Sequence, residues 1–180
     1  MSLYAIDTEF MEDGRTIELI SLTLVDAQGH SLYLQNRNAM LCNANPWVAA
    51  NVLQHLQHRA CKPRQNNRRI GRGPAHCAKQ TCPWIWHDQI ADCLCAFVAA
   101  DCTPPQWIGY YSAYDHIALC QCFGTMMDLP PGWPMYMQDL RQLLDAQGLE
   151  DVMQPDDMPH NALSDAQWIV ETYQRYIAVA

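Results

Sequence analysis

The chain has 180 residues, 49% of them hydrophobic and 17% charged, which is enough apolar material for one packed core and a length typical of one domain. Residues 1–10 lack the basic and apolar parts of a signal peptide, and no stretch approaches the roughly 20 apolar residues that cross a bilayer. The formal net charge of −8 argues against a polyanionic partner when the chain is considered as a whole. We therefore expect one domain over residues 1–180 in a soluble, cytoplasmic protein with no membrane association.

The first part of the chain predicts three strands and then a helix. An apolar run over residues 3–9 ends in two acids, and residues 16–26 and 30–35 follow as strands separated by a turn at residues 27–29. Residues 46–58 place apolar side chains at helical spacing, with Pro46 at the first turn. This order predicts an N-terminal β-meander followed by a helix.

The stretch from 59 to 84 contains prolines and glycines that break both periodicities, and we expect it to form a long loop or insertion. Seven of the 11 basic residues lie in it and no acid does, so it carries a charge of +7 against −15 elsewhere. Such asymmetry indicates a nucleic-acid surface, with Arg64, Arg68, Arg69 and Arg72 as candidate substrate contacts. The alternative is a solvated loop whose charge only maintains solubility.

The second part of the chain alternates helices with short strands. Helical spacing over 88–100 precedes a strand at 107–111, a helix at 114–123, a short strand at 135–137, and helices at 139–147 and 161–177. Strands first and alternating elements afterwards are typical of an α/β fold. We expect a five-stranded mixed sheet flanked by helices on both faces.

Two acids end the first predicted strand. Asp7 and Glu9 are two residues apart, so their side chains project from the same face, about 6.5 Å apart along the strand. Because the apolar residues before them predict a central strand, burying these carboxylates would be costly unless they are paired or bind a metal. The alternative is a strand end that reaches solvent.

Two later segments carry further candidates. Asp115 lies where the strand at 107–111 turns into a helix, a place where the helix dipole also favours an ordinary acid. Asn161 is a candidate N-cap, which places Asp165 in the first helical turn and His160 just before it. Each of these residues alone has an ordinary structural explanation, and their order along the chain links them to Asp7 and Glu9.

This order resembles the DEDDh 3′→5′ exonuclease superfamily, whose members have a ribonuclease H-like fold. The motifs that carry the resemblance are Asp7-Thr8-Glu9-Phe10, Tyr114-Asp115, and His160 followed by Asp165. Residues 7–21 are similar to a compact bacterial exoribonuclease branch, and the resemblance extends from residue 3 to about 177. It implies removal of nucleotides from RNA 3′ ends. The basic stretch is longer than the resemblance leads us to expect, and Ser112 stands where a small or amide residue is expected.

The resemblance also implies a two-metal mechanism. Asp7, Glu9, Asp115 and Asp165 would bind two Mg²⁺ or Mn²⁺ ions, for which hard carboxylate oxygens are suitable ligands, and His160 would act as the general base. Phe10 and Met11 are candidates to contact the terminal base, with core packing as the alternative. RNA is the expected partner, with single-stranded DNA as the alternative, and a homodimer is expected from related compact exoribonucleases.

Other interpretations stay open. A 3′→5′ DNA exonuclease of the proofreading type would use the same acids, whereas a non-catalytic nucleic-acid-binding protein would use the basic stretch alone. Cysteines in and around that stretch are candidate ligands of a structural zinc ion, although their spacing is irregular and reduced thiols are the alternative. These candidates are Cys61, Cys77 and Cys82, with His58, His76 and His87 nearby.

Overall fold

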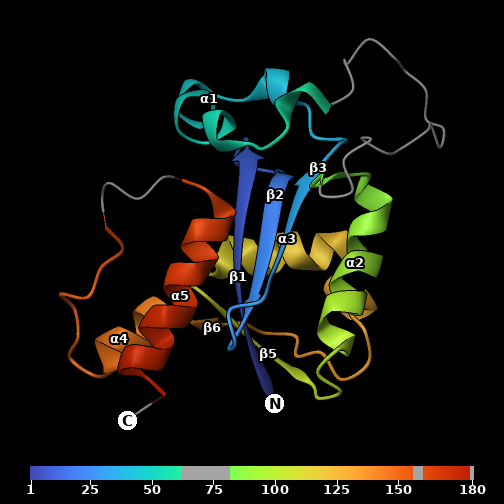
Figure 1. The fold of residues 1–180 in the computed structure, drawn as a ribbon. Helices are drawn as coiled ribbons and strands as arrows, with labels where there is room; N and C mark the ends of the chain where they lie inside the picture. The colour runs from blue at the N-terminus through green and yellow to red at the C-terminus, as the bar shows by residue number, and fades with distance from the viewer. Residues whose placement is uncertain (62–81, 156–159, 179–180) are drawn as a thin grey trace.

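A computed structural model describes residues 1–61, 82–155 and 160–178, and its centre is a mixed sheet of six strands in the order β4-β3-β2-β1-β5-β6 (Figure 1). Three strands form an antiparallel meander, namely β1 (Ser2–Glu12), β2 (Ile17–Asp26) and β3 (Ser31–Asn36). On the other side of β1, β5 (Pro105–Gly109) and β6 (Gln138–Asp139) continue the sheet in parallel. The edge strand β4 (Trp84–Ile85) pairs in parallel with β3.

The mixed α/β class predicted from the sequence is confirmed, but the predicted number of strands is wrong. The additional strand, β4, begins at Trp84, the last residue of the stretch that the sequence predicted as a loop, and ends one residue beyond it. Two residues are too short to show a periodicity, and β4 forms because the backbone N–H groups of Gln35 and Arg37 donate to the carbonyls of Pro83 and Ile85, both at 2.8 Å. The strand expected at 135–137 is also displaced, since β6 begins at Gln138.

Helices lie where helical spacing predicted them. Those described are α1 (Pro46–Asn51), α2 (His87–Ala99), α3 (Ala113–Phe123), α4 (Leu140–Ala146) and α5 (Ala162–Tyr176). Helix α1 is shorter than expected, because after Val52 the chain continues as the 3₁₀ turns η2 (Leu53–His55) and η3 (Arg59–Cys61). Two further 3₁₀ turns are η1 (Leu41–Asn43) and η4 (Met126–Asp128). Among the described residues no helix is both long and apolar enough to cross a membrane.

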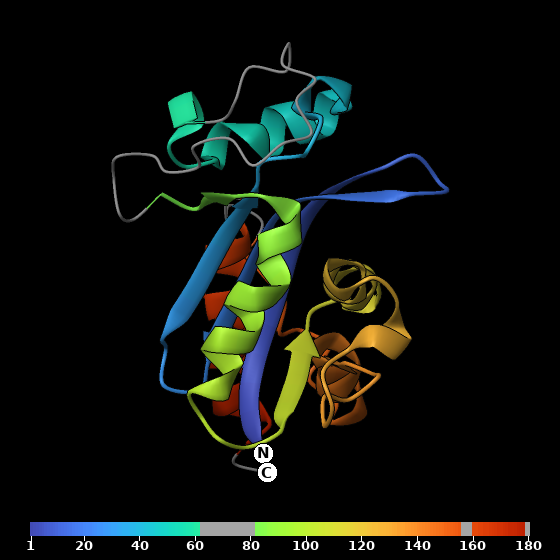
Figure 2. The same ribbon diagram turned by 90° about the vertical axis from the view of Figure 1, so that its right-hand side faces the viewer.

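The helices cover both faces of the sheet, with α2 in front of it and α5 behind it in Figure 2. Successive residues of a strand point to opposite faces, so Tyr4 and Ile6 pack against α2 and α3, while Ala5 packs against α4 and α5. The same alternation assigns Asp7 and Glu9 to the face covered by α5. The core therefore places both acids opposite the last helix of the chain.

A smaller apolar layer lies beyond the end of the sheet at which β1 terminates (Figure 1). It is formed by α1 and the 3₁₀ turns that follow, and its buried residues are Met11, Ile20, Ala39, Val48, Val52, Leu56 and Trp84. We call it the α1 layer. Because Met11 follows Glu9 by two residues, this layer lies beside the acidic end of β1.

Candidate active site

Strand β1 and helix α5 bring three carboxylates together. Asp7 and Glu9 come from β1 and Asp165 from the first turn of α5, and their ligand atoms lie within 4.8 Å of one another. Asp165 is only 6% exposed, and Asp7 and Glu9 are half-buried. We call Asp7, Glu9 and Asp165 the acid cluster. Its oxygen atoms are close enough together to share a cation.

Local structure explains why Asp165 faces β1. The side chain of Asn161 caps α5 by accepting a hydrogen bond from the Leu163 N–H at 3.0 Å, as the sequence predicted. The Asn161 backbone N–H and the Gln154 amide then donate to the two oxygens of Asp165, at 3.3 and 2.8 Å. These donors fix the orientation of the carboxylate. Nothing in the sequence pattern indicated Gln154, because it lies in an irregular segment between two helices.

Electrostatics in the acid cluster favour a positive partner. Burial, followed by the charges of Asp115, Glu9 and Asp165, raises the pKa of Asp7 well above its ordinary value. Burial and the neighbouring acids raise the pKa of Glu9 to about 8. Burial also raises the pKa of Asp165 to about 6, although hydrogen bonds from Asn161, Ser164 and Gln154 partly offset this increase. The fold therefore concentrates like charges that repel one another.

Basic side chains do not relieve this repulsion within the part of the chain that the structure describes. The two ion pairs there join His30 to Asp26 and Arg141 to Asp145, and neither includes a member of the acid cluster. Carboxylate oxygens alone, without thiolate or imidazole, are ligands typical of Mg²⁺ and Mn²⁺. The acid cluster thus has the donor set and the unbalanced charge that suit such ions.

Asp115 lies beside the acid cluster in the first turn of α3. It is 6% exposed, and its Oδ1 accepts hydrogen bonds from the backbone N–H and the hydroxyl of Thr8, at 2.9 and 2.6 Å. Burial raises its pKa to about 6, the Thr8 donors lower it, and the charge of Asp139 raises it. Among neighbouring charges, Asp115 contributes most to the raised pKa of Asp7. The two hydrogen bonds to Thr8, the residue between Asp7 and Glu9, therefore place Asp115 beside this part of β1, although outside the group of three whose ligand atoms lie within 4.8 Å.

His160 lies at the margin of the acid cluster. Its exposed side chain contacts Trp47 of α1 edge-on, with ring centroids 4.8 Å apart, and its backbone immediately precedes Asn161. The structure does not bring the His160 imidazole within the 4.8 Å group of ligand atoms. The neighbouring Asn161 links α5 to the α1 layer, because its side-chain amide donates to the His55 carbonyl at 3.4 Å.

The candidate substrate contacts have different surroundings. Phe10 stacks on Tyr114 with ring centroids 5.2 Å apart, and Tyr114 is 44% exposed. Met11 is 7% exposed within the α1 layer, which corresponds to the core-packing alternative. The remaining candidates, Arg64, Arg68, Arg69 and Arg72, lie outside the described residues, as do Cys77 and most of the basic stretch from 59 to 84.

Similarity to known proteins shows the family to which the chain belongs. No protein-family model matches the chain. Two curated relatives, from the CDC 1551 and H37Rv strains of Mycobacterium tuberculosis, are each 35% identical to it over 169 residues, which is 91% of this chain and 86% of theirs. Both are named 3′-5′ exoribonuclease. Identity at this level over nearly the whole length means that the chain is an exonuclease and belongs to the family of these 3′→5′ exoribonucleases.

Proposed function

We propose that this protein removes nucleotides from RNA 3′ ends by divalent-metal-dependent hydrolysis of the terminal phosphodiester. The observation that carries the proposal is the acid cluster, in which three carboxylates from β1 and α5 lie within 4.8 Å without a paired basic side chain among the described residues. The names of the two relatives support the direction of digestion and RNA as the substrate.

The donor set fits Mg²⁺ or Mn²⁺. Asp7, Glu9 and Asp165 would bind these ions, with Asp115 as a further ligand that Thr8 orients through two hydrogen bonds. Two bound ions would make the attacking water more acidic and neutralise charge on the phosphate. Substrate phosphate would supply additional oxygen ligands, so we expect metal binding to be stronger when RNA is present.

His160 is the proposed general base. In the reaction the water oxygen forms a bond to phosphorus, the bond between phosphorus and the 3′ oxygen breaks, and His160 accepts the proton that the water loses. The leaving 3′ oxygen takes a proton from solvent. The position of His160 supports this role, because its exposed ring lies one residue before the Asn161 N–H that donates to Asp165. In the proposed reaction the ring would rotate from Trp47 towards the acid cluster.

Substrate binding is proposed for two parts of the chain. The stacked rings of Phe10 and Tyr114 adjoin Glu9 and Asp115 in the sequence, and they offer an apolar platform for a terminal base. The basic stretch supplies a positive charge that the acidic remainder lacks, and would attract the phosphate backbone.

The remaining expectations belong to the same proposal. A meander joined to parallel strands and covered on both faces supports a ribonuclease H-like fold. One exonuclease domain over residues 1–180, a cytoplasmic location and a homodimer stay predictions.

Digestion of end-labelled single strands tests the proposal. With Mg²⁺ or Mn²⁺, RNA labelled at its 3′ end should release a labelled mononucleotide at once, whereas RNA labelled at its 5′ end should shorten step by step. DNA of the same sequence should be digested more slowly. Faster digestion of DNA would favour the proofreading alternative. Binding of RNA without cleavage by the unsubstituted protein would favour a non-catalytic nucleic-acid-binding protein.

A further inference from the structure

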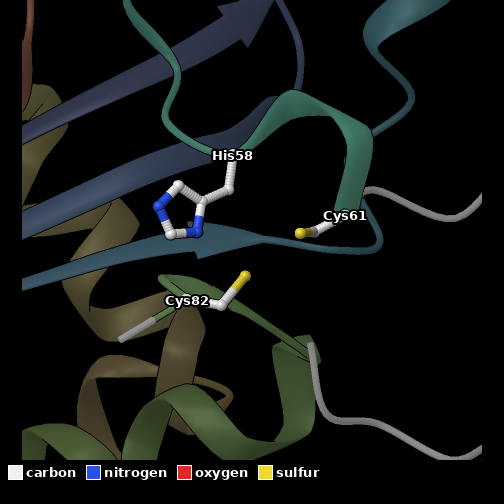
Figure 3. Close-up of side chains that lie close together, drawn as sticks. All are labelled: His58, Cys61 and Cys82. Atoms are coloured by element: carbon white, nitrogen blue, oxygen red, sulfur yellow. The ribbon is translucent and has the colours of Figure 1, made fainter. Parts of the chain in front are cut away.

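Three potential metal ligands converge outside the acid cluster. Figure 3 shows one ring nitrogen of His58 and the sulfurs of Cys61 and Cys82 facing one another, and these ligand atoms lie within 4.8 Å of one another. His58 immediately precedes the turn η3, Cys61 is the last residue of that turn, and Cys82 lies two residues before β4. Twenty residues separate the two cysteines in the sequence, so only the fold brings them together.

The imidazole of His58 has an unfilled bonding position. Its Nδ1 is buried and, among the described residues, has no hydrogen-bond partner. In Figure 3 this nitrogen, the one next to the carbon that joins the ring to the side chain, faces the two sulfurs. A buried ring nitrogen without a partner is costly, and a metal ion between it and the sulfurs would remove that cost.

We infer that His58, Cys61 and Cys82 bind a structural zinc ion, a site that is independent of the proposed function. Two thiolates and one imidazole are ligands that zinc prefers and that Mg²⁺ does not. A tetrahedral zinc ion, with bonds of about 2.3 Å to sulfur and about 2.0 Å to nitrogen, spaces its ligand atoms roughly 3.4–3.8 Å apart. Small side-chain rotations would bring the three ligand atoms from within 4.8 Å to this spacing.

Charge balance also favours zinc. On binding, the two thiols each release a proton to solvent, and the resulting thiolates neutralise the charge of Zn²⁺. A neutral cluster suits the half-buried position of all three side chains. The fourth tetrahedral position would be filled by water or by another donor, and the inference rests on His58, Cys61 and Cys82 alone.

Hydrogen bonds fix the backbone around these ligands before any metal binds. The Trp84 indole N–H lies 3.1 Å from the carbonyl of His58, to which it donates, and the Arg37 guanidinium donates to the carbonyl of Cys61 at 3.0 Å. The side chain of Gln35, which is fully buried, both donates to and accepts from the backbone of Gln57, at 2.9 and 2.7 Å. Gln35 of β3, Arg37 just after it and Trp84 of β4 thus hold the backbone of residues 57–61, which carries two of the three ligands.

A zinc ion here would join distant parts of the chain. It would link the α1 layer to β4 and would tie together the two ends of the segment 62–81, which contains six of the 11 basic residues of the chain. The α1 layer in turn contacts α5, through Trp47 against His160 and the His55 carbonyl bonded to Asn161. Loss of zinc should therefore lower thermal stability and weaken RNA cleavage indirectly.

Metal analysis of the full-length protein tests this inference. Protein purified in reducing buffer without chelator should contain about one zinc ion per chain. Cys82→Ser and His58→Ala should each lower the zinc content by at least about tenfold, whereas the matched variant Cys102→Ser, at an exposed cysteine elsewhere, should retain it. Circular dichroism of each variant would show whether it folds.

Cobalt distinguishes this site from the acid cluster. Metal-free protein given Co²⁺ alone should develop thiolate-to-cobalt absorption, which Asp7→Asn should keep and Cys82→Ser should lose. Absence of both zinc and this absorption in the folded, reduced, unsubstituted protein would overturn the inference, even if every variant failed to fold. Zinc that disappears in Asp7→Asn but persists in Cys82→Ser would also overturn it. Neither the zinc content nor the cobalt absorption depends on RNA cleavage, so the zinc site and the proposed function are tested separately.

Discussion

The acid cluster and the His58–Cys61–Cys82 site offer different kinds of metal ligand, and both lie beside the α1 layer. The acid cluster lies where β1 meets α5, and its ligands are carboxylates that repel one another. The other site lies where the α1 layer meets the edge strand β4, and its ligands are sulfur and nitrogen atoms with a backbone fixed by hydrogen bonds. Ligand type would thus direct different metal ions to the two sites.

The difference in ligands also suits the two sites to different roles. Carboxylates bind Mg²⁺ and Mn²⁺ weakly enough to leave positions for water and phosphate, which suits catalysis. Thiolates and imidazole bind zinc tightly, which suits a structural role. Substitutions at the acid cluster should therefore affect cleavage far more than stability, and those at the other site should do the reverse.

Asp7→Asn should have the largest effect on cleavage. The change removes one of the proposed metal ligands, so kcat should fall on the order of 10³-fold or more, while RNA binding is retained. The matched variant Asp88→Asn, at an exposed first-turn acid of α2, should cleave normally. Steady-state kinetics and filter binding measure both quantities. Unchanged kcat in Asp7→Asn would remove Asp7 from the mechanism.

His160→Gln should have the next largest effect. Loss of the proposed general base should lower kcat by roughly 10²-fold with little change in KM. Trp47→Phe keeps an aromatic contact and should change kcat far less. If His160→Gln keeps the kcat of the unsubstituted protein, another group accepts the proton.

Thr8→Val should have a smaller effect, because it acts through Asp115. The substitution removes the hydroxyl that donates to Asp115 at 2.6 Å but keeps the backbone N–H that donates at 2.9 Å. We expect kcat to fall by about tenfold, because a misaligned Asp115 would position the metal less well. Thr8→Ser restores a hydroxyl and should recover most of the activity. Equal loss in both variants would point to packing rather than to the hydrogen bond.

The acid cluster should make the metal-free protein less stable as the pH rises. Burial and repulsion raise the pKa of Glu9 from 4.5 to about 8, so the folded chain binds this proton more tightly than the unfolded chain does. Without metal, the free energy of unfolding should therefore decrease as pH rises through this range. Mg²⁺ or Mn²⁺ should raise the melting temperature by several degrees near pH 8 and hardly at all near pH 4.5.

Thermal unfolding with EDTA and with added Mg²⁺, across that pH range, measures this effect. Glu9→Gln is the matched variant, because it removes the charge while retaining the size of the side chain. Its metal-free stability should depend less on pH than that of the unsubstituted protein. A stabilisation by Mg²⁺ that is the same at both pH values would contradict the assignment.

Much of this arrangement could be predicted from the sequence because it depends on local rules. Strand alternation places Asp7 and Glu9 on one face, and the Asn161 cap orients the first turn of α5 that carries Asp165. The α/β class follows from the order of the elements. These features need only short-range information.

Other features depend on contacts between distant segments. The strand β4 has no periodicity of its own and forms through the backbone of β3, so the sequence predicted one strand too few. Gln154 and Thr8 contribute donors that only the tertiary structure shows. Irregular spacing likewise obscured the approach of Cys82 to Cys61, which the fold brings about across 20 intervening residues.

Counting bound Mn²⁺ ions tests most directly the claim that the acid cluster is the catalytic metal site. Electron paramagnetic resonance of Mn²⁺ titrated into each purified protein, with a non-hydrolysable RNA 3′ end present, gives the number of Mn²⁺ ions per chain. We predict two for the unsubstituted protein and for Cys82→Ser, and a loss of at least one for Asp7→Asn. If Asp7→Asn binds as many Mn²⁺ ions as the unsubstituted protein, the acid cluster is not the catalytic metal site.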